Sequence, residues 1–201
     1  LFAAGLGDAL STWFEARACK NSGARTMARG NVSNTGLMMA RLCYDLLMEK
    51  GRDALAAVER HEVTPALEDV VEATIYLSGL GFENGGLAAA HAVNDGFAQE
   101  PQAHGMYHGE KVAFGTLVQL VLEKAPQEEL EQVLAFLRDT GLPLTLAQLG
   151  VKEIVPETLK KVAEAAVVPT QSTKNLRADI TAQEVYHAIL EADRIGRDYL
   201  A

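Results

Sequence analysis

The amino-acid sequence predicts an all-α bundle of about eight helices. Alanine and leucine are frequent, and only six prolines interrupt the 201 residues. Apolar residues recur every three or four positions, which is the period of a helix with one buried face. Alternating apolar and polar patterns, which are typical of strands, are almost absent. We expect about eight helices of the usual length, about 10–14 residues each, joined by short loops.

The first two helices are expected within residues 5–22 and 34–51, where apolar side chains return at helical spacing. The Gly-Leu-Gly stretch before Asp8 suits a tight entry into the first helix. Gly51 is expected to end the second helix, because glycine readily adopts the left-handed conformation that closes many helices.

Three later helices carry recognisable end signals. Thr64 is the predicted N-cap of a helix whose first residue is Pro65. Residues 127–139 have one apolar face and end before a Gly-Leu-Pro stop. Thr181 and Glu184 form a predicted capping box, which opens the C-terminal helix.

The composition describes an acidic protein. The formal net charge of −9 disfavours nucleic acid and anionic membranes as partners, because both attract clustered Lys and Arg. No apolar run is long enough to span a membrane, and no signal peptide is recognisable. Cys19 and Cys43 are predicted to be buried, reduced thiols of a cytoplasmic protein. Without a repeat, low-complexity tract or linker, residues 1–201 are expected to form one domain.

Four glycines crowd the segment 79–86 and raise the question of a dinucleotide site. Such a site needs a strand before the glycines and an acidic residue about 20 positions later, after a second strand. Here a helical pattern runs into the glycines and their spacing differs, so a nucleotide site is disfavoured. We expect a helix stop and a turn that holds Phe82 towards a pocket, followed by a helix that packs closely through its alanines.

Three of the five histidines lie near one another in the sequence: His91, His104 and His108. His91 follows three alanines on a predicted helix, where a single histidine is more often a hydrogen-bonded core residue than a ligand. His104 is expected in a loop, and His108 is expected to open a helix. From the residues alone, exposed loop histidines and metal ligands stay equal interpretations of this pair. His61 and His187 are expected to have surface or structural roles.

Asp8 adds a third candidate ligand. A carboxylate at a helix start usually caps that helix. One aspartate and two histidines from separate helices, with a fourth position open, also form a ligand set for a catalytic divalent metal, and both zinc and iron accept it. The residue types therefore allow a metal site of Asp8, His91 and His108 without requiring one.

Longer motifs resemble a known family. They are "GLGDALSTWFEARAC", "LCYDLLMEKG", "VTPALEDVVEATIYLSGLGFENGGLAAAHAVNDGF" and "HGEKVAFGTLVQLVLE". In this order they closely resemble the glycerol dehydrogenase branch of the metal-dependent polyol and alcohol dehydrogenases often called iron-containing. The resemblance covers nearly the whole chain and is strongest from Gly5 to Glu123. It implies a helical C-terminal metal-binding domain of the dehydroquinate synthase-like fold.

The resemblance also implies roles for individual residues. The family's metal ligands, an aspartate and two histidines, correspond to Asp8, His91 and His108, which would also contact the substrate. The phenylalanine of "SGLGFE", which lines the family's substrate pocket, corresponds to Phe82. His104 matches no ligand and is expected in a loop or behind the ligands.

One departure from the wider family concerns the metal. Many iron-type members carry a fourth ligand, a histidine one turn after the aspartate, and Thr12 stands at that position here. Three protein ligands and an open position resemble the zinc-dependent branch, so zinc is expected rather than iron. The implied reaction is NAD-dependent oxidation of glycerol to dihydroxyacetone by a homo-oligomer. Nothing in the residue spacing selects glycerol over another vicinal diol.

A second departure concerns the nucleotide. Family members bind NAD with an α/β domain that precedes the stretch matching Leu1, and this chain has neither a strand-rich start nor a phosphate-binding glycine loop. We therefore expect this chain to be a C-terminal domain that lacks the NAD-binding domain. By itself, this C-terminal domain is expected to be inactive.

Two other hypotheses stay open. A non-catalytic assembly module, or a degenerate relative, predicts that Asp8, His91 and His108 need not converge. Ligand atoms more than about 5 Å apart would favour it, because zinc–ligand bonds are about 2.0–2.2 Å long. A superfamily enzyme with a phosphorylated or carboxylate substrate needs a basic cluster, whereas Lys111 is the one basic residue near the segments around Phe82 and His91.

Overall fold

The computed structural model describes residues 1–201 and consists of helices and loops, without a β-strand. The elements are α1 (Phe2–Ser22), α2 (Asn34–Glu59), α3 (Pro65–Glu72), η1 (Ala73–Leu77), α4 (Ser78–Gly85), α5 (Ala89–Gly96), η2 (Phe97–Gln99), η3 (Pro101–Ala103), α6 (His108–Glu123), α7 (Gln127–Asp139), α8 (Pro156–Ala166), α9 (Thr173–Leu176) and α10 (Ala182–Leu200). Helix α3, the π-helical turn η1 and α4 are continuous, so the chain has nine α-helices, besides the short 3-10 helices η2 and η3. The predicted all-α bundle of about eight helices is confirmed.

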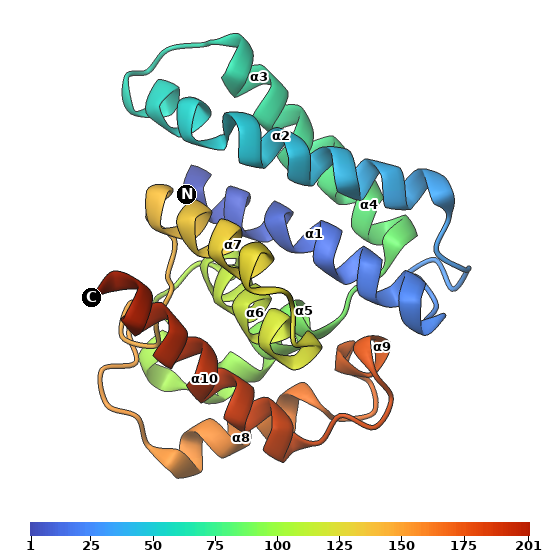
Figure 1. Ribbon diagram of the computed structural model, residues 1–201, viewed down its shortest axis with the longest axis vertical. Helices are drawn as coiled ribbons and strands as arrows, with labels where there is room; N and C mark the ends of the chain where they lie inside the picture. The colour runs from blue at the N-terminus through green and yellow to red at the C-terminus, as the bar shows by residue number, and fades with distance from the viewer.

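Helix α1 runs through the middle of the molecule (Figure 1). Helix α2 and the continuous α3–α4 rod pack against one side of α1 as a long pair, at the top of the view. Helix α6 packs against the other side of α1. Helices α5 and α10 each pack against α6, and α8 packs against α5 and α10. This order brings α1, α5 and α6 together inside the molecule.

The core is apolar and largely continuous. Four phenylalanine rings are among its largest fully buried side chains: Phe14, Phe97, Phe114 and Phe136. The rings of Phe97 and Phe114 meet edge to face with centroids 6.0 Å apart, a geometry that aromatic pairs favour. Cys19 and Cys43 are both buried free thiols, as predicted. None of the helices is long and apolar enough to cross a lipid bilayer.

Two predicted helix ends are wrong, because the glycines concerned serve close packing. Helix α1 begins at Phe2, so the Gly-Leu-Gly stretch lies inside the helix and Asp8 does not cap it. Helix α2 continues through Gly51 to Glu59. A Cβ at Gly51 would stand 2.9 Å from Cε2 of Phe136, so this glycine makes room for a ring of the neighbouring helix.

The other end signals are confirmed. The Thr64 side chain accepts a hydrogen bond from the backbone N–H of Leu67 at the start of α3. Thr181 and Glu184 form the predicted capping box at the start of α10. Gly141 adopts a φ of 70° just after α7, which is the left-handed conformation that a glycine stop requires.

The glycine-rich segment 79–86 is helical over most of its length. Helix α4 extends to Gly85 and stops at Gly86, which has a φ of 91°. A Cβ at Gly85 would lie 2.6 Å from Cβ of Ala16, so Gly85 allows α4 to approach α1. Phe82 therefore lies on a helix and not on the predicted turn. The alanines that follow are fully buried, as predicted.

Candidate metal centre

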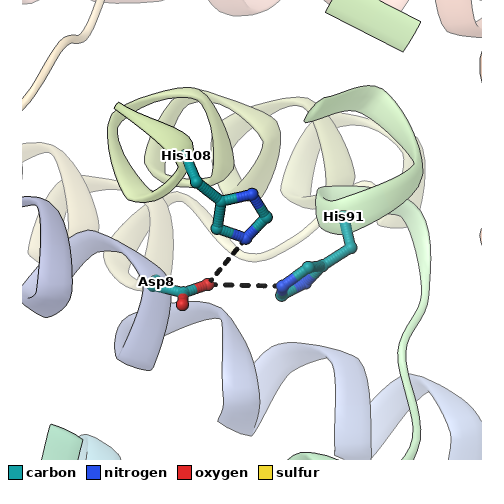
Figure 2. A group of neighbouring side chains, drawn as sticks. All are labelled: Asp8, His91 and His108. Carbon is teal, nitrogen blue, oxygen red and sulfur yellow. Dashed lines mark ion pairs between the residues drawn. The ribbon is translucent and has the colours of Figure 1, made fainter. Parts of the chain in front are cut away.

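The three candidate ligands come from three different helices (Figure 2). Asp8 lies in the second turn of α1, His91 lies in the first turn of α5, and His108 is the first residue of α6. Their side chains point towards one another where these helices meet. Since the residues are far apart in the sequence, helix packing alone brings them together.

A small residue next to each ligand allows this close helix packing. Gly7 precedes Asp8, and a Cβ at Gly7 would lie 2.5 Å from the carbonyl oxygen of Gly109, the residue after His108. A Cβ at Gly115 would overlap the carbonyl oxygen of Ala90, the residue before His91. Helix α6 therefore approaches α1 closely beside Asp8 and His108, and it approaches α5 closely beside His91.

The distances between the ligand atoms suit one shared ion. Oδ1 of Asp8 is 3.3 Å from Nε2 of His91 and 3.4 Å from Nε2 of His108. One ligand atom from each residue lies within 4.8 Å of the others. Ligands bonded at about 2.1 Å to a tetrahedral metal lie about 3.4 Å from one another. The ligand atoms of Asp8, His91 and His108 therefore converge. A non-catalytic assembly module would not require this convergence.

His91 is held by a residue that the sequence analysis missed. Glu15 lies on α1 with no exposed surface, and its Oε2 atom is 2.6 Å from Nδ1 of His91. This contact turns the opposite ring nitrogen, Nε2, towards Asp8. The one available signal was the spacing of seven residues from Asp8, which puts both carboxylates on one face of a helix.

The electrostatics of the cluster favour a positive charge on His91 and a negative charge on Asp8. Burial lowers the pKa of His91, but the negative charge of Glu15 and the hydrogen bonds to Asp8 and Glu15 outweigh this effect and raise the pKa to about 10. Burial raises the pKa of the Asp8 carboxyl, but hydrogen bonds and charges from His108 and His91 hold it far below its usual range. The cluster thus provides an ionised Asp8 carboxylate and a His91 imidazole for which a cation and a proton would compete.

The centre is open on one side. The His91 side chain is 19% exposed, whereas the Asp8 and His108 side chains are 43% and 54% exposed. Thr12 is buried one turn after Asp8, and its hydroxyl is hydrogen-bonded to the hydroxyl of Ser78 at 2.9 Å. Three side chains with metal-ligating atoms therefore meet beside solvent, and Thr12 turns its oxygen to another helix.

The remaining histidines lie outside this cluster. His104 lies in an exposed turn, with Nε2 3.1 Å from the carbonyl oxygen of Ala98. His61 is exposed in the loop after α2, and His187 is exposed on α10, as predicted. Phe82 is 36% exposed on α4, a helix that contributes none of the three candidate ligands.

No protein-family model matches the chain. Among curated proteins it is similar to the glycerol dehydrogenase of Escherichia coli O6:H1, with 57% identity over 200 residues, and to that of Pseudomonas putida, with 52% identity over 200 residues. Both matches include the whole of this chain but 54% and 55% of the relative. The chain therefore spans about half the length of these relatives.

Solved structures share the fold at high similarity. The glycerol dehydrogenase of Schizosaccharomyces pombe aligns with a TM-score of 0.95 and 40% identity, over 98% of this chain and 51% of that one. A probable glycerol dehydrogenase from Sinorhizobium meliloti aligns with a TM-score of 0.94 and 44% identity, over 98% of this chain and 56% of that one. The fold is that of the C-terminal helical domain of iron-containing alcohol dehydrogenase-like proteins, so the predicted resemblance is confirmed.

Proposed function

Because this chain is homologous over its whole length to the C-terminal helical domain of the glycerol dehydrogenases, we propose that it is the metal- and substrate-binding domain of an NAD-dependent polyol dehydrogenase. The proposed reaction is oxidation of glycerol to dihydroxyacetone. The observation that carries the proposal is the convergence of ligand atoms from Asp8, His91 and His108 within 4.8 Å.

The proposed metal is zinc. Three protein ligands with an open position are typical of catalytic zinc sites, and Thr12 contributes no fourth ligand because its hydroxyl contacts Ser78. A bound divalent ion supplies Lewis-acid chemistry that lowers the pKa of a hydroxyl group and stabilises the developing negative charge.

The chain's own residues determine where that chemistry takes place. The Asp8 carboxylate would balance part of the cation's charge, and the imidazoles of His91 and His108 would bind it as neutral ligands. The exposed sides of Asp8 and His108 give a small polyol access from solvent. On the opposite edge of the site, the largely buried His91 contacts the fully buried Glu15. Phe82 is proposed to line the substrate pocket, on the basis of the family resemblance.

The remaining assignments also rest on the resemblance. The nucleotide-binding part of the complete protein is proposed to lie outside residues 1–201, where it would present the hydride acceptor NAD to the substrate. The complete protein is proposed to be a cytoplasmic homo-oligomer. In this arrangement the helical domain supplies orientation and charge, while the cofactor carries out the redox chemistry.

The test is to measure metal content and glycerol-dependent NAD reduction in the complete protein. His108→Ala should lower the activity by at least about 100-fold and reduce the bound metal, since even a residue behind a metal ligand typically contributes 10- to 100-fold in affinity or activity. His104→Ala is the matched control, because His104 lies four residues earlier and outside the cluster. Equal metal content in the two variants would refute the proposed ligand set.

A further inference from the structure

Glu15 contacts both the side chain and the backbone of His91. Its Oε2 atom lies 2.6 Å from Nδ1 of the imidazole. Its Oε1 atom accepts hydrogen bonds from the backbone N–H groups of Ala88, at 2.8 Å, and of His91, at 3.0 Å. A fully buried carboxylate is costly unless it is well paired, and these three donors, together with the Ser11 hydroxyl at 3.5 Å from Oε2, satisfy it.

The two backbone contacts of Glu15 also cap the start of helix α5. The N-cap residue of this helix, Ala88, has no side-chain acceptor of its own. Oε1 of Gln119 on α6 accepts hydrogen bonds from the backbone N–H groups of Ala89 and Ala90, each at 3.0 Å. Glu15 and Gln119 therefore divide the unpaired N–H groups of this helix end between them. Glu15 differs from Gln119 because it also binds the imidazole.

We propose that Glu15 is the positioning residue that makes His91 a metal ligand. A carboxylate only accepts hydrogen bonds, so the proton in the 2.6 Å contact belongs to Nδ1 of His91. The lone pair of a neutral imidazole then lies on Nε2, which faces Asp8 at 3.3 Å. The inference rests on the proposed metal site, and it assigns a role to a residue that touches neither metal nor substrate.

Glu15→Gln separates this role from helix capping. The two backbone N–H groups still require an oxygen, so the amide oxygen of glutamine stays on Ala88 and His91. The amide NH₂ group then faces Nδ1 of His91 and donates to it. The neutral imidazole must carry its proton on Nε2, the atom that should bind the metal. The substitution is nearly isosteric, so the fold is preserved while the tautomer is inverted.

The experiment measures zinc affinity by chelator competition in the complete protein and its variants. Glu15→Gln should weaken zinc binding about 10- to 100-fold, the usual effect of losing a partner behind a ligand. Gln119→Leu is the matched control, because it removes two caps of α5 without touching the imidazole. It should lower the melting temperature at least as much as Glu15→Gln and change zinc affinity less than about threefold.

A spectroscopic measurement on the wild-type protein tests the same role independently of folding defects in a variant. Nitrogen-15 NMR of the zinc-loaded protein should show His91 protonated at Nδ1 and bound through Nε2. Binding through Nδ1 would overturn the role of Glu15, and so would equal zinc affinities of wild type and Glu15→Gln or equal losses in both variants. A wild-type protein that binds no zinc would instead refute the proposed function itself.

Discussion

Gly7 and Gly109 meet backbone to backbone where α1 crosses α6, with a Cβ at Gly7 falling 2.5 Å from the carbonyl oxygen of Gly109. The two glycines are the immediate neighbours of Asp8 and His108 in the sequence. A larger residue at either position would push the helices apart at the point where the candidate ligands converge. The geometry of the metal centre therefore depends on the absence of two side chains.

Two glycines of α1 should respond to alanine in opposite ways. Gly7→Ala should destabilise the fold by about 1–3 kcal/mol, because overpacking a tight contact forces the backbone to shift. Gly5→Ala should be neutral or stabilise by up to about 1 kcal/mol, since nothing lies within 4 Å of its Cβ position and alanine favours helix. Urea titration of both variants measures the two free energies of unfolding. Equal effects would contradict the role given to the Gly7–Gly109 contact.

The Thr12 hydroxyl should matter for stability and not for metal binding. Thr12→Val keeps the shape of the side chain but leaves the buried Ser78 hydroxyl without its partner, which should cost about 1–3 kcal/mol of unfolding free energy. The zinc stoichiometry should stay unchanged. Thr74→Val is a suitable control, because Thr74 bonds only to carbonyl groups of its own helix. A loss of zinc in Thr12→Val would make Thr12 part of the site.

The C-terminal helix should show an acid-dependent contribution from Glu184. Hydrogen bonds from Thr181 and Arg177 lower the pKa of Glu184 to about 2, from a usual value of 4.5. Because the folded-state pKa is the lower one, the contribution is present above about pH 4.5 and disappears as the pH falls towards 2. Glu184→Gln should remove this pH dependence, so wild type and variant should approach equal stability near pH 2. Thermal unfolding of both between pH 2 and 7 measures it; a constant difference would contradict the assignment.

Much of the fold could be predicted because its signals are local. Thr64 before Pro65 and the Thr181–Glu184 box mark helix starts through contacts within one turn, and such contacts need no knowledge of the tertiary structure. The turn at Gly141 is equally local.

The errors arose where a glycine serves a distant partner. The sequence predicts that Gly51 ends a helix, whereas its role depends on the ring of Phe136 in another helix. The Gly-Leu-Gly stretch before Asp8 has the same explanation, since Gly7 faces Gly109. A sequence pattern does not distinguish a glycine that ends a helix from one that lets two helices touch.

The candidate site was predicted in part for a related reason. Asp8, His91 and His108 carry residue types that suit metal binding, and the family resemblance selected them from the other histidines. For Glu15 the one signal is its spacing of seven residues from Asp8, and this spacing does not distinguish a buried carboxylate from an exposed one. Its role became visible only when folding placed its carboxylate 2.6 Å from the ring of His91.

The most direct test of the metal centre is to locate the ion in crystals of the complete protein by anomalous scattering at the zinc absorption edge. The proposal predicts one strong peak, at about 2.0–2.2 Å from a carboxylate oxygen of Asp8 and from Nε2 of both His91 and His108. A zinc peak held by other residues, or no peak among these three in zinc-saturated crystals, would contradict it.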